Sequence, residues 1–178
     1  NFILTSDEKD ELLKQYPEVE SLIKEFIGGK ELLKGTKRYV IWLKDADPNL
    51  YLNCPPILNR IHAVKSYRLL KKTSNVSSIV EKPTLFASIA SIKGSHYIAI
   101  PEYSSESRKY IPMLYLDKEV IASNKLYMVD DGSLYEFGVL ESNVHMAWMK
   151  TFGGKLESRY AYSSGFVYNT FPWPKPTV

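Results

Sequence analysis

The chain has very little cysteine and no long hydrophobic run, and each of these absences excludes a class of protein. Its 178 residues include a single cysteine, Cys54, so no disulfide can form within the chain. No apolar stretch approaches the roughly 20 residues that a membrane-spanning helix needs, and the first residues show no signal-peptide pattern. We therefore expect a cytoplasmic protein with no membrane partner.

The sequence also lacks the short motifs that carry common catalytic chemistry. The Gly-Gly-Lys run at residues 28–30 does not have the spacing of a phosphate-binding loop, and no GxGxxG or GxSxG motif is present. The histidines are scattered and, with one cysteine, form no zinc pattern. Cys54 lies between prolines without an evident partner that would make it a nucleophile. We therefore expect binding rather than catalysis, with no catalytic residue, metal or cofactor in this chain.

What the chain does carry is an uneven distribution of charge. Its formal net charge is +3, but residues 1–50 hold ten acidic and eight basic side chains, which gives −2. Residues 56–112 hold nine basic and three acidic side chains, which gives +6. A helix is predicted over residues 56–72, and it contains no acidic residue, although mixed signs would stabilise it. This asymmetry indicates a polyanionic partner; the alternative is a basic face that is merely solvated.

The hydrophobic pattern predicts an α+β fold in which mixed, mainly antiparallel sheets are flanked by helices. Residues 5–29 should form two short helices separated at Pro17, with the glycines at 28 and 29 ending the second. Residues 38–43 should form a buried strand, and several short strands should follow residue 83, the first over residues 84–92. Asp130-Asp131-Gly132 predicts a hairpin turn between two strands. Residues 141–152 return to a helix.

Five stretches of the sequence occur together, and in the same order, in one known family. They are FIGGKELLKGTKRYVIWL, SSESRKYIP, VIASNKLYMV, LYEFGVLESNVHMAWM and YSSGFVYNTFPWP, which fall within residues 20–174. In this respect the chain resembles the target-recognition region of the MmeI-like (type IIG/IIL) restriction-modification enzymes. There, one polypeptide carries an endonuclease segment, an adenine-N6 DNA methyltransferase domain and a DNA-reading domain.

The resemblance implies that the chain is a fragment that recognises a sequence in double-stranded DNA. The parent enzyme would use S-adenosylmethionine and magnesium, which would bind outside this chain, and the methyltransferase domain of the same polypeptide would be a partner. The expected organisation is an N-terminal helical segment or linker (1–36), the recognition domain (37–170) and a proline-rich C-terminal strap (171–178). Phe171 and Trp173 of the strap are expected to pack on the methyltransferase domain.

Two stretches rich in cations are predicted to contact DNA phosphates. Cations, hydroxyls and backbone N–H groups fix the register of a protein on DNA without reading its sequence. For Arg108 the alternative is an internal ion pair with Glu106 or another acid. The predicted phosphate-binding residues are Arg60, Lys65, Arg68, Lys71 and Lys72 in the helix, and Ser104, Ser105, Arg108 and Lys109 in the serine-rich run, residues 104–109.

Base readout requires side chains that can form paired hydrogen bonds with base edges, as Lys or Arg does with guanine and Asn with adenine. In the strand-rich half the candidates are Lys93, His96, Asn124 and Lys125. The alternative for each is an exposed polar residue of a strand or loop.

Two other functions stay open at this point. The chain could be a non-catalytic protein-interaction or scaffolding domain that docks a partner subunit through its aromatic surface. It could also bind single strands or RNA, with its 13 tyrosines as stacking surfaces.

Overall fold

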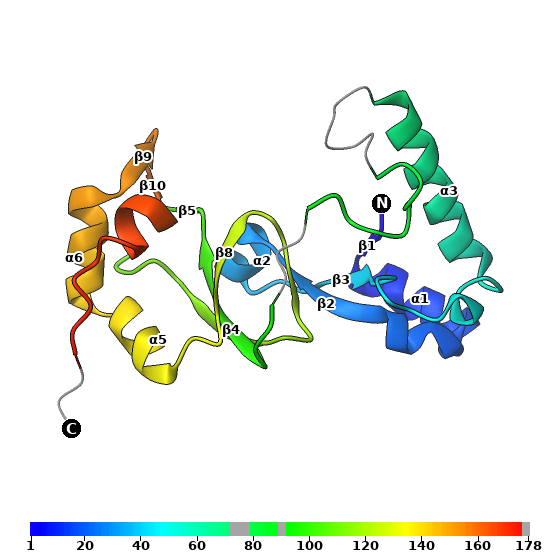
Figure 1. Ribbon diagram of the computed structural model, residues 1–178, viewed down its shortest axis with the longest axis horizontal. Coiled ribbons are helices and arrows are strands. Elements are labelled where there is room, and N and C mark those ends of the chain that lie inside the picture. Colours follow the sequence, from blue (N-terminus) through cyan, green and yellow to red (C-terminus); the bar gives the residue numbers. More distant parts are fainter. Residues whose placement is uncertain (72–78, 89–91, 176–178) are drawn as a thin grey trace. The chain divides into compact units, whose positions relative to one another are not determined.

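The computed structural model describes residues 1–71, 79–88 and 92–175, which form two compact units (Figure 1). Within the described residues, unit 1 is drawn from Asn1–Ile27, Lys37–Ile89 and Glu119–Ile121. Unit 2 is drawn from Gly28–Thr36, Ala90–Lys118 and Ala122–Val178. This division by packing differs from the three segments expected from the sequence, which stay a prediction. No helix among the described residues combines the length and apolarity needed to cross a membrane.

Unit 1 is built on a small antiparallel sheet. Strand β3 pairs with β1 on one side and β2 on the other, and the short β7 (Ile121–Ala122) extends the sheet beyond β2. Helix α1 begins with a capping box, in which the Thr5 hydroxyl accepts from the Glu8 N–H and the Glu8 carboxylate accepts from the Thr5 N–H. In chain order, the elements of unit 1 before β7 are β1 (Ile3–Leu4), α1 (Ser6–Gln15), the 3₁₀ helix η1 (Pro17–Leu22), β2 (Ile23–Ile27), β3 (Arg38–Ile41), the 3₁₀ helix η2 (Pro48–Leu50) and α3 (Pro55–Leu70).

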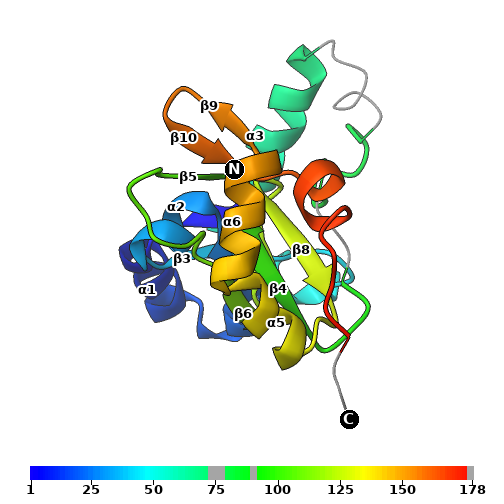
Figure 2. The ribbon, with the colours of Figure 1, turned by 90° about the vertical axis from the view of Figure 1, so that its left-hand side faces the viewer.

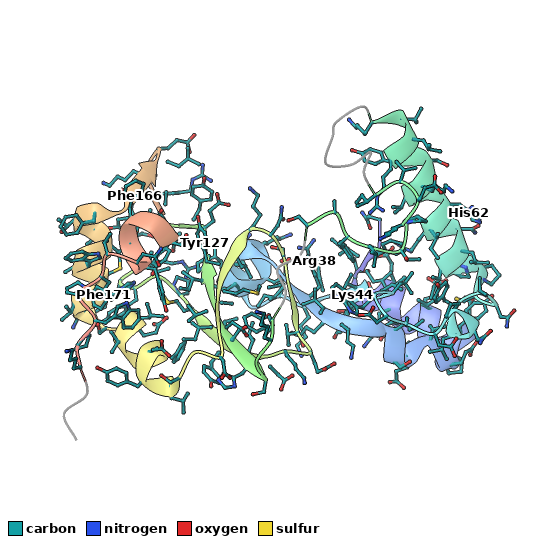
Figure 3. The ribbon with its side chains drawn as sticks, viewed as in Figure 1. Arg38, Lys44, His62, Tyr127, Phe166 and Phe171 are labelled. Carbon is teal, nitrogen blue, oxygen red and sulfur yellow. The ribbon has the colours of Figure 1, made fainter. Side chains whose placement is uncertain are left out.

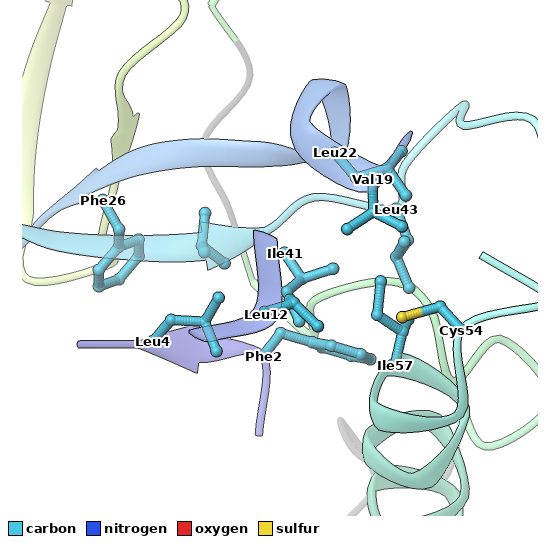
Figure 4. Packing of buried hydrophobic residues seen from close by; sticks show 11 residues of the cluster. Phe2, Leu4, Leu12, Val19, Leu22, Phe26, Ile41, Leu43, Cys54 and Ile57 are labelled. Carbon is cyan, nitrogen blue, oxygen red and sulfur yellow. The ribbon is translucent and has the colours of Figure 1, made fainter. Parts of the chain in front are cut away.

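The core of unit 1 joins helix α3 to the sheet. Figure 4 shows this cluster, in which Phe2 just before β1, Leu4 of β1 and Ile41 of β3 share one buried core with Cys54 and Ile57. Cys54 and Ile57 belong to the start of α3, and neither has any exposed surface. The start of the basic helix is therefore fixed by apolar packing.

The prediction of a second N-terminal helix is wrong. Residues Pro17–Leu22 form a 3₁₀ helix, and Ile23–Ile27 form strand β2, which pairs with β3 in the register Ile23↔Ile41 and Phe26↔Arg38. Hydrogen bonds to a distant strand outweigh the local helical preference of these residues. Gly28 does not end a helix but begins one: it is the N-cap of α2 (Gly29–Lys34), which ends at Gly35 in the left-handed conformation, φ +66°.

Unit 2 contains two antiparallel three-stranded sheets, with strand orders β6-β4-β8 and β5-β10-β9. Helices α5 and α6 lie on one side of the first sheet (Figures 1 and 2). There Ile98 and Ile100 of β4 share a core with Leu140 of α5 and with Met146 and Met149 of α6. After α2, the elements are β4 (His96–Pro101), β5 (Tyr103–Ser104), β6 (Leu114–Asp117), β8 (Leu126–Asp130), α5 (Leu134–Leu140), α6 (Asn143–Phe152), β9 (Gly154–Leu156), β10 (Arg159–Ala161) and the π-helix η3 (Ser164–Tyr168).

The α+β prediction is confirmed, but the predicted hairpin at residues 130–132 is wrong. Strand β8 ends at Asp130, and Ser133 then caps helix α5 by a second capping box with Glu136. This local signal for a helix start decides the structure after the turn. The strand expected at residues 84–92 is also wrong where the structure describes it, because residues 84–88 form turns and bends.

Candidate nucleic-acid interface

Helix α3 carries three of the predicted phosphate-binding residues, Arg60, Lys65 and Arg68. Pro55 and Pro56 occupy its first turn, where the missing N–H of proline is tolerated. One side of the helix packs into the core through Ile57, whereas His62 is exposed on the outer side (Figure 3). The helix therefore has one anchored face and one face open to solvent.

Arg60 and Lys65 have acidic partners that come from outside the helix. The Arg60 guanidinium donates to Glu8 Oε1 at 3.0 Å and to the Asn1 carbonyl at 2.9 Å. Lys65 Nζ donates to Glu81 Oε2 at 3.2 Å. The pKa of Glu8 lies below its ordinary value, first because the Thr5 N–H donates to the carboxylate and then because Arg60 lies beside it. A helix without acids thus obtains its counter-charges from neighbouring segments.

Arg68 has a different environment, since it is only 7% exposed. Its guanidinium donates to the backbone carbonyls of Ile79, Lys82 and Leu85 at 3.2, 2.9 and 2.5 Å. Burial lowers its pKa from the ordinary value. Arg68 therefore fastens the segment after α3 to the helix.

The remaining cations of this region are Lys71 and Lys72. Lys71 is exposed, and its Nζ lies 5.5 Å from the centroid of the Tyr67 ring. The prediction for Lys72 falls outside the described residues.

The serine-rich run in unit 2 is partly buried. Ser104 belongs to β5, pairs with Tyr160 of β10 and is 2% exposed. Ser105 is exposed, and its hydroxyl lies 2.8 Å from that of Ser107. The guanidinium of Arg108 donates to the carbonyl of Leu33 at 3.0 Å. Lys109 is exposed and lies over the Tyr110 ring, 5.3 Å from its centroid. The cations and Ser105 face solvent, whereas Ser104 is held inside the sheet.

Lys93 lies just before β4, whose first residue is His96, and Asp130 orders the backbone there. The Asp130 carboxylate accepts from the N–H groups of Lys93 and Gly94, both at 3.0 Å, and these bonds hold its pKa below the ordinary value. The His96 ring stacks on Tyr115, with 4.8 Å between centroids. The Lys93 side chain is exposed beside this fixed backbone.

Asn124 and Lys125 form the exposed turn that precedes β8, and the Lys125 N–H donates to the Ser123 hydroxyl at 3.2 Å. This turn lies at the other end of the β4–β8 pair, because the register runs from Tyr97↔Asp130 to Pro101↔Leu126. At about 3.4 Å per residue, the two groups of candidates are separated by roughly 15 Å. The structure therefore does not bring the four predicted base-reading residues into one cluster.

The hairpin β9–β10 was not predicted from the sequence. Its turn contains Glu157 in the left-handed conformation, φ +57°, and the Glu157 carboxylate accepts from Arg159 at 2.8 Å. Lys155 and Arg159 are exposed on the two strands. A two-stranded ribbon has the size that the DNA major groove admits. The sequence signal for it is a short polar turn between GKL and RYA, which is too weak to find without the pairing of β10 with β5.

The chain is similar in sequence and in fold to known proteins. The family model described as "MmeI, target recognition domain" matches residues 1–175. The chain belongs to the MmeI target recognition domain family. A curated relative, DNA methyltransferase A of Bacillus subtilis (strain 168), is 34% identical over 173 residues, which are 97% of this chain and 20% of the relative. A solved structure of the type IIL restriction-modification enzyme MmeI in complex with DNA superposes with a TM-score of 0.91 and 38% identity, over 99% of this chain and 23% of that one.

Membership of the MmeI target recognition domain family confirms the resemblance found in the sequence, and it extends that resemblance to residue 1. The similar structure covers almost the whole chain. The observed elements that differ from the sequence predictions, such as strand β2 and helix α5, therefore belong to the family's fold. The scaffolding alternative is not favoured. The chain spans about a fifth of the length of these two relatives.

Proposed function

We propose that this chain recognises a specific sequence in double-stranded DNA as the target-recognition domain of a restriction-modification adenine-N6 DNA methyltransferase. The observation that carries the proposal is the family match over residues 1–175, together with the 0.91 TM-score to an enzyme solved in complex with DNA. The exposed cations and polar turns described above are the groups that such recognition needs.

The contacts divide into two kinds in this proposal. Cations and a hydroxyl bind phosphates and fix the register. Those on the described surface are Arg60, Lys65, Lys71, Ser105, Arg108 and Lys109. Lys72, outside the described residues, is assigned to the same role from the sequence alone. The carboxylate partners of Arg60 and Lys65 can be exchanged for phosphates, because ion pairs at a surface are weak. Arg68 and Ser104 support their segments from inside. Their share in phosphate binding is indirect.

Base edges are read by Lys93, His96, Asn124 and Lys125. Because the two groups lie at opposite ends of the β4–β8 pair, each addresses a different part of the site. The Asp130 carboxylate and the Ser123 hydroxyl fix the backbones of the two groups, so that the side chains project from ordered turns.

The rest of the proposed enzyme would supply the chemistry. S-adenosylmethionine and magnesium would bind in the methyltransferase and nuclease parts of the same cytoplasmic polypeptide, and the target adenine would be flipped into the methyltransferase pocket. Nowhere in the described ranges are three His, Cys, Asp or Glu side chains grouped so that they could hold a metal ion. The described residues therefore offer no ligand set for magnesium, and the task assigned to this chain is to hold and select the duplex.

Alanine variants test the two kinds of contact separately. Replacing Lys65, Lys71 and Lys109 together should weaken binding to every duplex and reduce the salt slope by about 0.9 for each lost phosphate contact. Replacing Asn124 and Lys125 should instead change the motif selected from a randomised duplex library, at about 1–3 kcal/mol for each lost base contact. An unchanged slope in the first variant, or an unchanged motif in the second, would contradict the assignment of that group.

A further inference from the structure

Unit 2 contains an open groove whose lining is almost entirely apolar. It has a volume of about 510 Å³ and lies between α5, the start of α6 and the strap that follows η3. Leu134 and Val144, on its walls, are 70% and 67% exposed, which is unusual for two large aliphatic side chains in one place. Its nine lining residues include Leu134, Tyr135, Val139, Val144, Phe171 and Pro174.

The strap forms one wall of the groove and is held to unit 2. Phe171, labelled in Figure 3, makes edge-on contacts with the rings of His145 at 4.7 Å and Trp148 at 6.0 Å, and it is 5% exposed. Trp173 packs edge-on against Phe171 and Tyr168. Phe171 is thus mostly used within the core of unit 2, whereas Trp173 keeps a half-exposed ring, and the expectation that the two rings pack on another domain stays a prediction. The groove beside them is left open.

Both polar side chains of the groove already make hydrogen bonds. The Tyr135 hydroxyl donates to the carbonyl of Pro174 at 2.8 Å, and the Ser142 hydroxyl accepts from the His145 N–H at 3.2 Å. None of the nine lining residues is charged. A surface that binds DNA is polar and rich in cations, and a polar ligand needs free hydrogen-bonding groups. The groove therefore suits an apolar protein segment.

The similar proteins indicate where such a segment would come from. This chain corresponds to 20% of one relative and to 23% of the other, so most of each of these polypeptides lies outside the matched region. Contacts between domains of one chain bury apolar surface at their centre. We propose that the groove between α5, α6 and the strap seats an apolar segment from the remainder of the same polypeptide. This inference rests on the proposed function, in which the chain is one part of a larger enzyme.

The groove can be probed with a single thiol, because Cys54 is fully buried and burial raises its pKa. Val144→Cys places a thiol on the groove wall. Leu156→Cys is the matched control, since Leu156 is an exposed apolar residue of the same unit, at 43% exposure, outside the groove. Both variants are made in this chain and in the complete polypeptide, and the rate of maleimide labelling at each position is measured by peptide mass spectrometry.

We expect the thiol at position 144 to react about tenfold or more slowly in the complete polypeptide than in this chain, because a covered thiol is inaccessible. The control should react at similar rates in both. Equal rates at position 144, or equal protection at position 156, would overturn the proposal. If protection of the thiol at position 144 rises with the concentration of this chain alone, the groove binds a second copy. If the thiol is protected only when duplex is added, the groove binds DNA. Either result overturns the proposal. Duplex binding is measured separately, so that failure of the proposed DNA recognition can be distinguished from failure of the groove proposal.

Discussion

Replacement of Arg68 tests whether this residue serves the fold or contacts phosphate directly. In the structure its guanidinium bonds to three backbone carbonyls and is 7% exposed. A hydrogen bond from a charged donor contributes roughly 1.5–3 kcal/mol, and a buried carbonyl without a partner is destabilising. The three bonds are not additive, because water can reach some of the released carbonyls. We therefore expect Arg68→Ala to lower the free energy of unfolding by about 3–4 kcal/mol.

Two other variants serve as controls for the loss of stability expected in Arg68→Ala. Arg60→Ala removes an exposed ion pair and should lower the free energy of unfolding by only about 1 kcal/mol or less. Arg68→Lys keeps the charge but cannot reproduce the planar fork of guanidinium donors, so it should recover only part of the loss. Urea denaturation of the three variants and the wild type, followed by circular dichroism, measures the differences.

The outcome separates the two roles of Arg68. If Arg68→Ala lowers the free energy of unfolding by less than about 1 kcal/mol, the three carbonyl contacts do not stabilise the fold as argued here. If the variant is as stable as the wild type and its salt slope for duplex binding falls by about 0.9, Arg68 contacts a phosphate directly.

Two further predictions concern unit 2. Burial lowers the pKa of His145 from 6.5 to about 4. Between pH 6.5 and pH 4 the unfolded chain therefore binds more protons than the folded chain, and the free energy of unfolding falls as the pH drops through this range. Unfolding at pH 5 should require about 2 kcal/mol less than at pH 7 from this group, and His145→Gln should remove this contribution; an unchanged pH dependence would contradict it. Gly138 of α5 has open space around it, so Gly138→Ala should stabilise the fold by about 0.5–1 kcal/mol. Gly153→Ala should destabilise it, because an added Cβ would lie 2.4 Å from the Met149 carbonyl oxygen. Melting temperatures should move in opposite directions for the two alanine variants, and a shift of the same sign would refute the contrast.

Elements with a strong local pattern could be predicted from the sequence. The apolar run at residues 38–43 contains β3, and the stripe through Ile57, Ile61 and Val64 defines the packed side of α3. Elements decided by distant partners could not. Strand β2 exists because it exchanges backbone hydrogen bonds with β3. The short polar turn after Leu156 becomes a hairpin because β10 pairs with β5.

The candidate site shows the same limit. Arg68 lies on the same side of α3 as Ile57, Ile61 and Val64, so its position indicated burial. Its positive charge instead favoured the prediction of an exposed phosphate contact. Ser104 is buried by pairing with Tyr160, which lies 56 positions further along the sequence. Counting charges identified the basic helix, but the counting could not show that Glu8 and Glu81 from other segments pair with two of its cations. Composition thus locates candidate contacts, and packing decides which of them face solvent.

The most direct test of the central claim is equilibrium binding of the wild-type chain to a randomised duplex library, to random duplex and to the matched single strand, each over a range of salt concentrations. The account predicts preference for duplex, affinity that falls steeply with salt, and enrichment of one short motif. Binding that favours the single strand, or duplex binding without any enriched motif, would contradict sequence-specific recognition of double-stranded DNA by this chain.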